Sequence, residues 1–286
     1  MFYHVKELQY QAKPERPDPV FAKKLQEILG GAHGEITVAM QYLFQGWASR
    51  ADAKYRDLLL DTGAEELAHI EMLATMIARL LDKAPVQHQE EFVSKDPIVA
   101  AVLGGMNPQH VIVSGLGAQP ADSVGYPWNG RYVDASGNLL ADFRSNLVKE
   151  SNGRLQAVRL YESTTDRGVK DMLSFLIARD TMHQNQWLAA IAELEEREGR
   201  TVPNTFPRQL EKQEVSYAFF NLSRGEESAA GRWAKGPSPD GLGQFQYVSQ
   251  PKPFGEKPVL KPAPPFVHNT MPPLPPKAMP SMPPHI

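Results

Sequence analysis

The sequence predicts an all-α core in which four long helices form a bundle, followed by an extended, proline-rich C-terminal tail. Four stretches of about thirty residues carry helical periodicity, whereas the average helix has roughly 11–12 residues. Helices of that length in one chain favour a bundle. Hydrophobic residues make up 42% of the 286, enough for a sizeable core. Of the 25 prolines, 13 fall between Pro251 and Pro284, where neither helix nor central strand can form.

The first predicted helix runs from about Pro19 to Ser49. Asp18 is its candidate N-cap, with Pro19 at the first helical position, where the missing N–H costs nothing. A short turn near Ala51 leads to a second helix over about Ala53 to Lys83. The shortness of this turn predicts that the two helices are antiparallel neighbours.

The third predicted helix covers about residues 138–164, and Asp134 and Ser136 are its candidate caps. The fourth covers about residues 167–197 and ends at Gly199, a typical helix terminator. These two helices should form the second antiparallel pair of the bundle.

A link over about residues 84–136 separates the two helix pairs, and its length is unusual inside a compact domain. Such a link allows the second pair to start at the far end of the bundle, as the single crossover of ferritin-like folds does. We therefore expect an N-terminal segment over residues 1–18, a ferritin-like four-helix bundle over 19–200, and an irregular C-terminal region over 201–286.

The end of the chain should be extended and in part polyproline-like. Composition alone is equally compatible with a disordered tail and with an arm that wraps a neighbouring subunit. We favour the arm because it carries apolar side chains to bury, namely Phe254, Leu260, Phe266, Val267 and Leu274.

Charge and composition exclude several classes of protein. The net charge is −3, and the sequence has no run of Lys and Arg that would indicate a nucleic-acid-binding surface. Cysteine is absent, so any metal must be held by oxygen and nitrogen ligands. We expect no signal peptide, because residues 1–13 lack a basic start followed by an apolar stretch. The uncharged residues 97–121 are interrupted by Asn107 and Pro108, unlike a membrane helix. We expect a soluble, cytoplasmic protein that makes no contact with a membrane.

The second helix contains Glu66 and, three positions later, His69. Three residues at about 100° each bring both side chains to within about 60° on one face. The same face carries Leu59, Ile70 and Leu73, so the carboxylate is directed inward, which is costly unless a cation compensates it. Alone, a Glu-x-x-His motif is more often part of a solvated face.

The pattern occurs twice, which makes chance a poor explanation. Glu35 precedes Glu66 by 31 residues, and Glu150 precedes Asp180 by 30; His183 then follows Asp180 by three. Each of these residues lies on a mostly apolar helix face. Two Glu, Glu-x-x-His units are typical of di-iron and di-manganese bundles, and three carboxylates with two imidazoles suit a pair of first-row ions.

Asp180 is one methylene shorter than Glu66 and is expected to fall short of the metals. It would then act as an acid that moves protons near them. Lys149, next to Glu150, is expected either to pair with Asp180 or to be a solvated lysine.

Several longer strings resemble the manganese catalase family over nearly the whole chain. They are Leu8-Gln9-Tyr10, Ala12-Lys13-Pro14, Arg16-Pro17-Asp18-Pro19, Glu65-Glu66-Leu67-Ala68-His69, Gly105-Met106-Asn107-Pro108-Gln109-His110 and Gly125-Tyr126-Pro127-Trp128-Asn129-Gly130. The resemblance implies two manganese ions per subunit. One would be held by Glu35, Glu66 and His69, and the other by Glu66, Glu150 and His183, with Glu66 bridging.

The resemblance also implies roles beyond the ligands. Lys149 and Asp180 occupy the positions of the family's basic and acidic pair, where some members have Arg and Glu. Tyr42 resembles a hydrogen-bond partner of the ligands, although a core tyrosine is an equal reading. Family members are hexameric in general, and they also carry calcium. The matching calcium positions are Asp57, Asp61, Asn221, Ser223 and Gly225. Without the resemblance, Asp57 and Asp61 would be interpreted as part of a solvated helix face.

The predicted function is the conversion of hydrogen peroxide to oxygen and water by two manganese ions cycling between Mn(II)₂ and Mn(III)₂. Asp180, through Lys149, is the expected acid–base group. A di-iron oxidase or ferroxidase on the same bundle is the nearest alternative, because the same ligands bind iron. A second alternative is a structural, coat-type assembly protein. Such a protein would be expected to have lost some of the metal ligands, whereas all five ligand positions are filled here. The predicted assembly is a homohexamer with C-terminal arms that contact neighbouring subunits.

Overall fold

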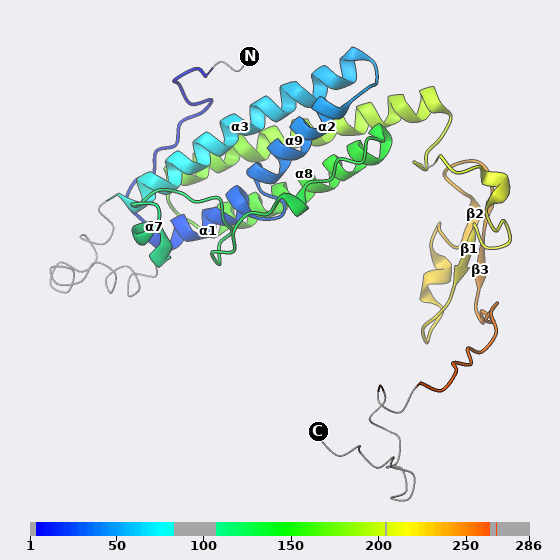
Figure 1. The fold of residues 1–286 in the computed structure, drawn as a ribbon. Helices are drawn as coiled ribbons and strands as arrows, with labels where there is room; N and C mark the ends of the chain where they lie inside the picture. The colour runs from blue at the N-terminus through cyan, green and yellow to red at the C-terminus, as the bar shows by residue number, and fades with distance from the viewer. Residues whose placement is uncertain (1–3, 83–106, 204, 264–266, 268–286) are drawn as a thin grey trace, which may run out of the picture. The chain divides into compact units, whose positions relative to one another are not determined.

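The computed structural model describes residues 4–82, 107–203, 205–263 and 267 (Figure 1). The chain divides into two units between Phe206 and Pro207, and each is described by itself. The first unit is dominated by helices, and the second contains a small sheet. The first part of the predicted crossover and most of the proline-rich arm lie outside the described residues.

In the described part of the first unit five helices form the body, with α1 and α2 following one another along the length of α3 (Figure 1). α2 packs along α3, α8 packs along α9, and α1 contacts both α3 and α8. Among the residues that the structure describes between α3 and α8, two short elements occur, α7 and η1. The bounds are α1 Pro19–Gly30, α2 Glu35–Ala48, α3 Ala53–Leu81, α7 Pro108–Ile112, η1 Gly130–Tyr132, α8 Leu139–Glu162 and α9 Arg167–Glu198.

The prediction of one helix over residues 19–49 was wrong, because the chain leaves the helix after Gly30 and starts again at Glu35. Glycine is required in the break. A Cβ on Gly30 would lie 2.4 Å from the carbonyl oxygen of Ala121, and one on Gly34 would lie 2.8 Å from that of Ile28. Glu35 thus becomes the first residue of α2, where the helix dipole favours a negative charge.

Two of the three helix ends predicted from the sequence are confirmed, at Asp18 and at Gly199. Asp18 accepts a hydrogen bond from the third residue of α1, and Gly199 ends α9 in the left-handed conformation at φ 61°. At α8 the prediction of Asp134 or Ser136 was wrong, since Asn138 is the cap. Ser136 binds instead to the side chain of Asp142 in the first turn of α8, donating to it from both its amide and its hydroxyl.

Two hydrophobic clusters fill the first unit, and they occupy opposite parts of the long helices. The first cluster includes Phe21, Leu25, Met72, Leu73, Met76, Ile77, Leu80, Met172, Leu173 and Leu176. The second includes Val38, Tyr42, Tyr55, Leu59, Leu140, Phe143, Trp187, Ile191 and Leu194. Along α3, residues 66–69 fall between the clusters, and along α9 residues 180–183 do the same. The middle of the helices is therefore enclosed by apolar side chains at both ends.

The second unit holds a three-stranded sheet of order β1-β3-β2, from β1 Ala218–Phe220, β2 Lys235–Pro237 and β3 Gln244–Val248. β1 is parallel to β3, and β2 is antiparallel to it. The prediction of a wholly irregular region was wrong here. Strands of three to five residues, one of them containing Gly and Pro, are too short to show the alternation that identifies a strand. Within the described part of the chain, no helix is long and apolar enough to cross a membrane.

Gly168, in the first turn of α9, offers a test of this packing. Its absent Cβ would lie 1.8 Å from the backbone oxygen of Lys13, so the N-terminal segment crosses α9 in direct contact. Alanine normally favours a helix over glycine, but Gly168→Ala should lower the free energy of unfolding by about 1–3 kcal/mol because of this overlap. Gly130→Ala is the control, since a Cβ there meets nothing within 4 Å. Urea denaturation of both variants measures the difference, and a stabilised Gly168→Ala protein would contradict the packing.

Candidate metal centre

Four helices bring five ligand-type side chains together in the middle of the first unit. Glu35 begins α2, Glu66 and His69 lie on α3, Glu150 on α8, and His183 on α9. They form two groups of three that share Glu66, and within each group the donor atoms lie within 4.8 Å of one another. These are the five residues that the sequence predicts as metal ligands.

The Glu66 carboxylate lies between the two imidazoles. Its Oε2 is 2.7 Å from Nδ1 of His69, and its Oε1 is 2.7 Å from Nδ1 of His183. The outer carboxylates are more distant: His69 Nδ1 is 3.6 Å from Glu35 Oε2, and His183 Nδ1 is 3.5 Å from Glu150 Oε1. Each imidazole therefore presents Nδ1 to two carboxylates, one of which is shared.

Burial makes this arrangement costly without a cation. Glu66 is 1% exposed, and both imidazoles are fully buried. Glu66 Oε1 and His183 Nδ1 approach to 2.7 Å, yet neither atom has a hydrogen-bond partner among the described residues, because the contact lacks the required angles. Two potential ligand atoms that lie close together without a hydrogen bond between them are suited to bind one metal ion jointly. Oxygen and imidazole nitrogen are also the donors that first-row ions such as manganese accept.

The pKa shifts of the site residues also indicate a site that is suited to bind a cation. Burial and the charge of Glu66 raise the pKa of Glu35 well above its ordinary value. Burial alone would lower the pKa of His183, but hydrogen bonds with Glu150, Glu65 and Glu66 outweigh it and raise the pKa to about 12. Without metal, the cluster therefore balances its negative charge by holding protons.

Tyr42 contacts the ligand set directly, because its hydroxyl donates a hydrogen bond to Oε1 of Glu150. The ring is fully buried and lies 5.1 Å from that of Trp187, centroid to centroid. Burial and the charge of Glu150 raise the pKa of Tyr42 well above its ordinary value, so the hydroxyl keeps its proton. It is thus both a core residue and a ligand partner.

Asp180 is 6% exposed and lies close enough to the carboxylates to respond to them. Burial and the charges of Glu150 and Glu66 raise the pKa of Asp180 well above its ordinary value. Asp180 is absent from both groups of potential ligands, as its shorter side chain predicts. It is therefore a buried carboxyl beside the ligand set with a raised proton affinity.

The expected pairing of Lys149 with Asp180 is wrong. Among the described residues no ion pair joins the two, and Nζ of Lys149 donates instead to the backbone oxygens of Tyr132, at 2.8 Å, and Ala32, at 3.2 Å. Lys149 is buried rather than solvated, and burial lowers its pKa. The unpaired carbonyls of the turn between α1 and α2 and of η1 offer acceptors on the side of α8 where Lys149 lies. It fastens these segments to α8.

Glu65 belongs to the surroundings of the site, and the sequence analysis did not identify it as such. Its carboxylate accepts a hydrogen bond from His183 Nε2 at 3.1 Å and lies 3.7 Å from His69 Nε2. Burial would raise the pKa of Glu65, but the hydrogen bonds from His183 and Arg179 and the nearby His69 imidazole outweigh it and lower the pKa far below its ordinary value. The position of Glu65 four residues before His69 on the same helix was the available signal.

The predicted calcium positions fall in both units. Asp57 and Asp61 are exposed on α3 of the first unit. Asn221, Ser223 and Gly225 form a loop of the second, closed by hydrogen bonds from Asn221 Nδ2 to the Gly225 oxygen and from the Ser223 amide to Asn221 Oδ1. Because each unit is described by itself, the calcium site stays a prediction.

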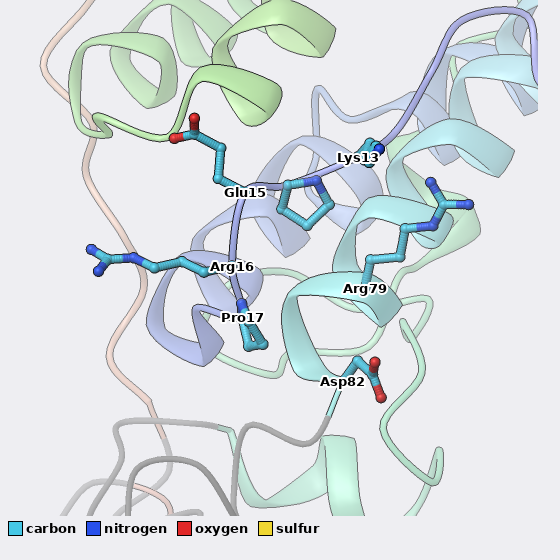
Figure 2. Close-up of a pocket in the computed structure, with 7 residues that line it drawn as sticks. Lys13, Glu15, Arg16, Pro17, Arg79 and Asp82 are labelled. Carbon is cyan, nitrogen blue, oxygen red and sulfur yellow. The ribbon is translucent and has the colours of Figure 1, made fainter.

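A surface cavity of about 530 Å³ lies where the N-terminal segment crosses the end of α3 (Figure 2). It is lined by Lys13, Pro14, Glu15, Arg16, Pro17, Arg79 and Asp82. Two of its charges have partners: Glu15 pairs with Arg167, and Arg79 donates to the Ala12 oxygen. None of the predicted site residues borders this cavity, so it is separate from the metal centre.

Comparison with known proteins agrees with this geometry. The family model for manganese containing catalase matches residues 1–281. The chain is 65% identical to a manganese catalase of Bacillus subtilis over 272 residues, or 95% of this chain and 99% of that one. It is 48% identical to a manganese catalase of Lactiplantibacillus plantarum over 94% of this chain and 99% of the other.

The crystal structure of KatB, a manganese catalase from Anabaena, superposes with a TM-score of 0.68. The match covers 88% of this chain and 100% of the KatB chain, at 26% identity. The sequence matches, the fold and the enclosed set of carboxylates and imidazoles agree: this chain belongs to the manganese-containing catalase family.

Proposed function

We propose that this chain is a manganese catalase that converts two molecules of hydrogen peroxide to two of water and one of oxygen. The observation that carries this proposal is the pair of buried donor groups that share Glu66. A single carboxylate common to both groups is the arrangement that holds two metal ions near each other. Family membership makes manganese the expected metal and peroxide the expected substrate.

In this proposal each subunit holds two manganese ions. Glu35, Glu66 and His69 ligate one, and Glu66, Glu150 and His183 ligate the other. The bound pair supplies a store of two electrons, so that one peroxide can be reduced and a second oxidised without release of a radical. The protein contributes the donor geometry and, through the two hydrophobic clusters, an enclosure that limits water.

Asp180 is the acid–base group of the proposed reaction. Reduction of peroxide to water consumes protons, and oxidation of peroxide to oxygen releases them. Because burial and the nearby carboxylates raise the pKa of Asp180, its carboxyl holds a proton more readily than an ordinary aspartate and can donate and later recover it. Tyr42 holds Glu150 by its hydrogen bond, and Lys149 holds the backbone at Ala32 and Tyr132.

The finer features of the fold and assembly belong to the same proposal. We infer a ferritin-like four-helix bundle with one long crossover between α3 and α8, and a homohexamer in which proline-rich arms contact neighbouring subunits. Family membership supports these features. A calcium ion at the positions on α3 and in the 221–225 loop, and a location in the cytoplasm, likewise stay predictions.

Oxygen release from hydrogen peroxide is the first test of the function. Protein expressed with manganese should release oxygen at an oxygen electrode, and Glu66→Ala should release none because both metal positions lose the shared ligand. Glu71→Ala is the control, since it removes an exposed carboxylate from the same helix. A manganese-loaded parent without oxygen release would reject the catalase function. Consumption of oxygen with Fe(II) would then favour the di-iron alternative.

The role of Asp180 predicts a separation of metal binding from turnover. Asp180→Asn should keep two manganese ions per chain but lose about 10²- to 10⁴-fold in kcat, the usual range for a general acid–base group. Metal analysis and steady-state oxygen release on the same sample measure both quantities. Full activity in a metal-loaded Asp180→Asn protein would assign the proton transfers to another group.

Manganese affinity should rise with pH. The two imidazoles carry protons in the metal-free protein at neutral pH, because the surrounding carboxylates raise the pKa of His69 and His183 despite burial. Metal binding must displace these protons, so the dissociation constant should fall as the pH increases between about 6 and 8. Calorimetric titration in buffers of different ionisation enthalpy measures the number of protons released. Binding without proton release would show that the imidazoles are neutral beforehand.

A further inference from the structure

One carboxylate outside the ligand set contacts both histidines of the centre. The nitrogen of each imidazole that faces Glu66 is Nδ1, and the opposite nitrogen, Nε2, faces Glu65. His183 Nε2 lies 3.1 Å from Glu65 Oε2, and His69 Nε2 lies 3.7 Å from Glu65 Oε1. The two rings, which come from different helices, lie 5.8 Å apart and within 27° of parallel. They therefore present the same edge to a single side chain.

Two further residues fix the direction of the Glu65 carboxylate. Arg179 on α9 donates from Nε to Oε1 at 2.6 Å and from a terminal nitrogen to Oε2 at 3.1 Å, a two-pronged ion pair. Gln9 of the N-terminal segment donates to Oε1 at 2.9 Å. Such a carboxylate is held at both oxygens and cannot rotate to follow one imidazole away from the other.

A carboxylate paired with Arg179 accepts hydrogen bonds and donates none. The bond from His183 therefore keeps one ring proton on Nε2, so that the proton displaced by a metal ion is the one on Nδ1. His69 Nε2 has no hydrogen-bond partner among the described residues, and Oε1 of Glu65 is the acceptor that faces it. In each case Nδ1 is the nitrogen turned towards Glu66.

We propose that Glu65 is a shared positioning residue that sets the tautomer and orientation of both imidazoles and thereby couples the two metal positions. This inference rests on the proposed ligand assignment and assigns a role outside it. Partners of this kind make a ligating histidine more basic and typically account for about 10- to 100-fold in metal affinity. A change at Glu65 should therefore affect both ions, although each has its own outer carboxylate.

The test compares manganese binding to the full-length parent and to Glu65→Gln, a substitution of nearly the same shape that cannot accept at both oxygens. Both dissociation constants should increase by about 10- to 100-fold. Arg179→Lys keeps the positive charge but loses the two-pronged ion pair with Glu65. It should therefore increase both dissociation constants, but less than Glu65→Gln does. Glu71→Gln, an exposed change on the same helix, is the matched control and should shift neither. Electron paramagnetic resonance of the coupled pair reports whether both ions occupy one centre.

Three outcomes separate the possibilities. Unchanged constants in Glu65→Gln, or a change at one position only, would overturn the shared role. A lower melting temperature of the metal-free variant with parental metal affinity would indicate a purely structural role and would also overturn it. If the parent binds two manganese ions without releasing oxygen from peroxide, the proposed function fails, while the effect of Glu65 on both constants still tests this inference.

Discussion

The placement of Glu66 between two imidazoles is the constraint on which the rest of this structure depends. A carboxylate with 1% exposure cannot stay ionised in an apolar interior unless positive charge lies beside it. Its two oxygens each lie 2.7 Å from an imidazole nitrogen, and those imidazoles come from α3 and α9. Both helices must therefore keep a fixed rotation and a fixed height relative to each other.

The hydrophobic clusters satisfy that requirement from both sides. On α3 and on α9 the polar positions are flanked by one cluster towards one end of the helix and by the other cluster towards the opposite end. Close packing resists sliding and rotation of the helices. The apolar residues thus hold the donors in place, and the low polarity they create strengthens the electrostatic interactions within the centre. Stability and chemistry are served by the same side chains.

Much of this arrangement could be predicted from the sequence, because the signals are local. The repeated Glu, Glu-x-x-His spacing and the apolar helix faces identified the five donors that the structure brings together. Asp180 was separated from them by the length of its side chain. What escaped prediction depends on contacts between distant segments. Gly30 must be glycine because a Cβ there would overlap the backbone of Ala121, and Lys149 finds backbone acceptors at Ala32 and Tyr132. No periodicity within a single helix reports such contacts.

Because the helix is broken between α1 and α2, the geometry of the metal centre does not depend on the number of residues in α1. In a continuous helix, an insertion or deletion of one residue would rotate every later side chain by about 100°. Here the helix restarts at Glu35, so its direction is set by the glycine turn and by α2 alone. Length changes within α1 can be absorbed before the first donor is reached. The register of the donor set therefore does not depend on the length of α1, although the apolar face of α1 still packs in the first cluster.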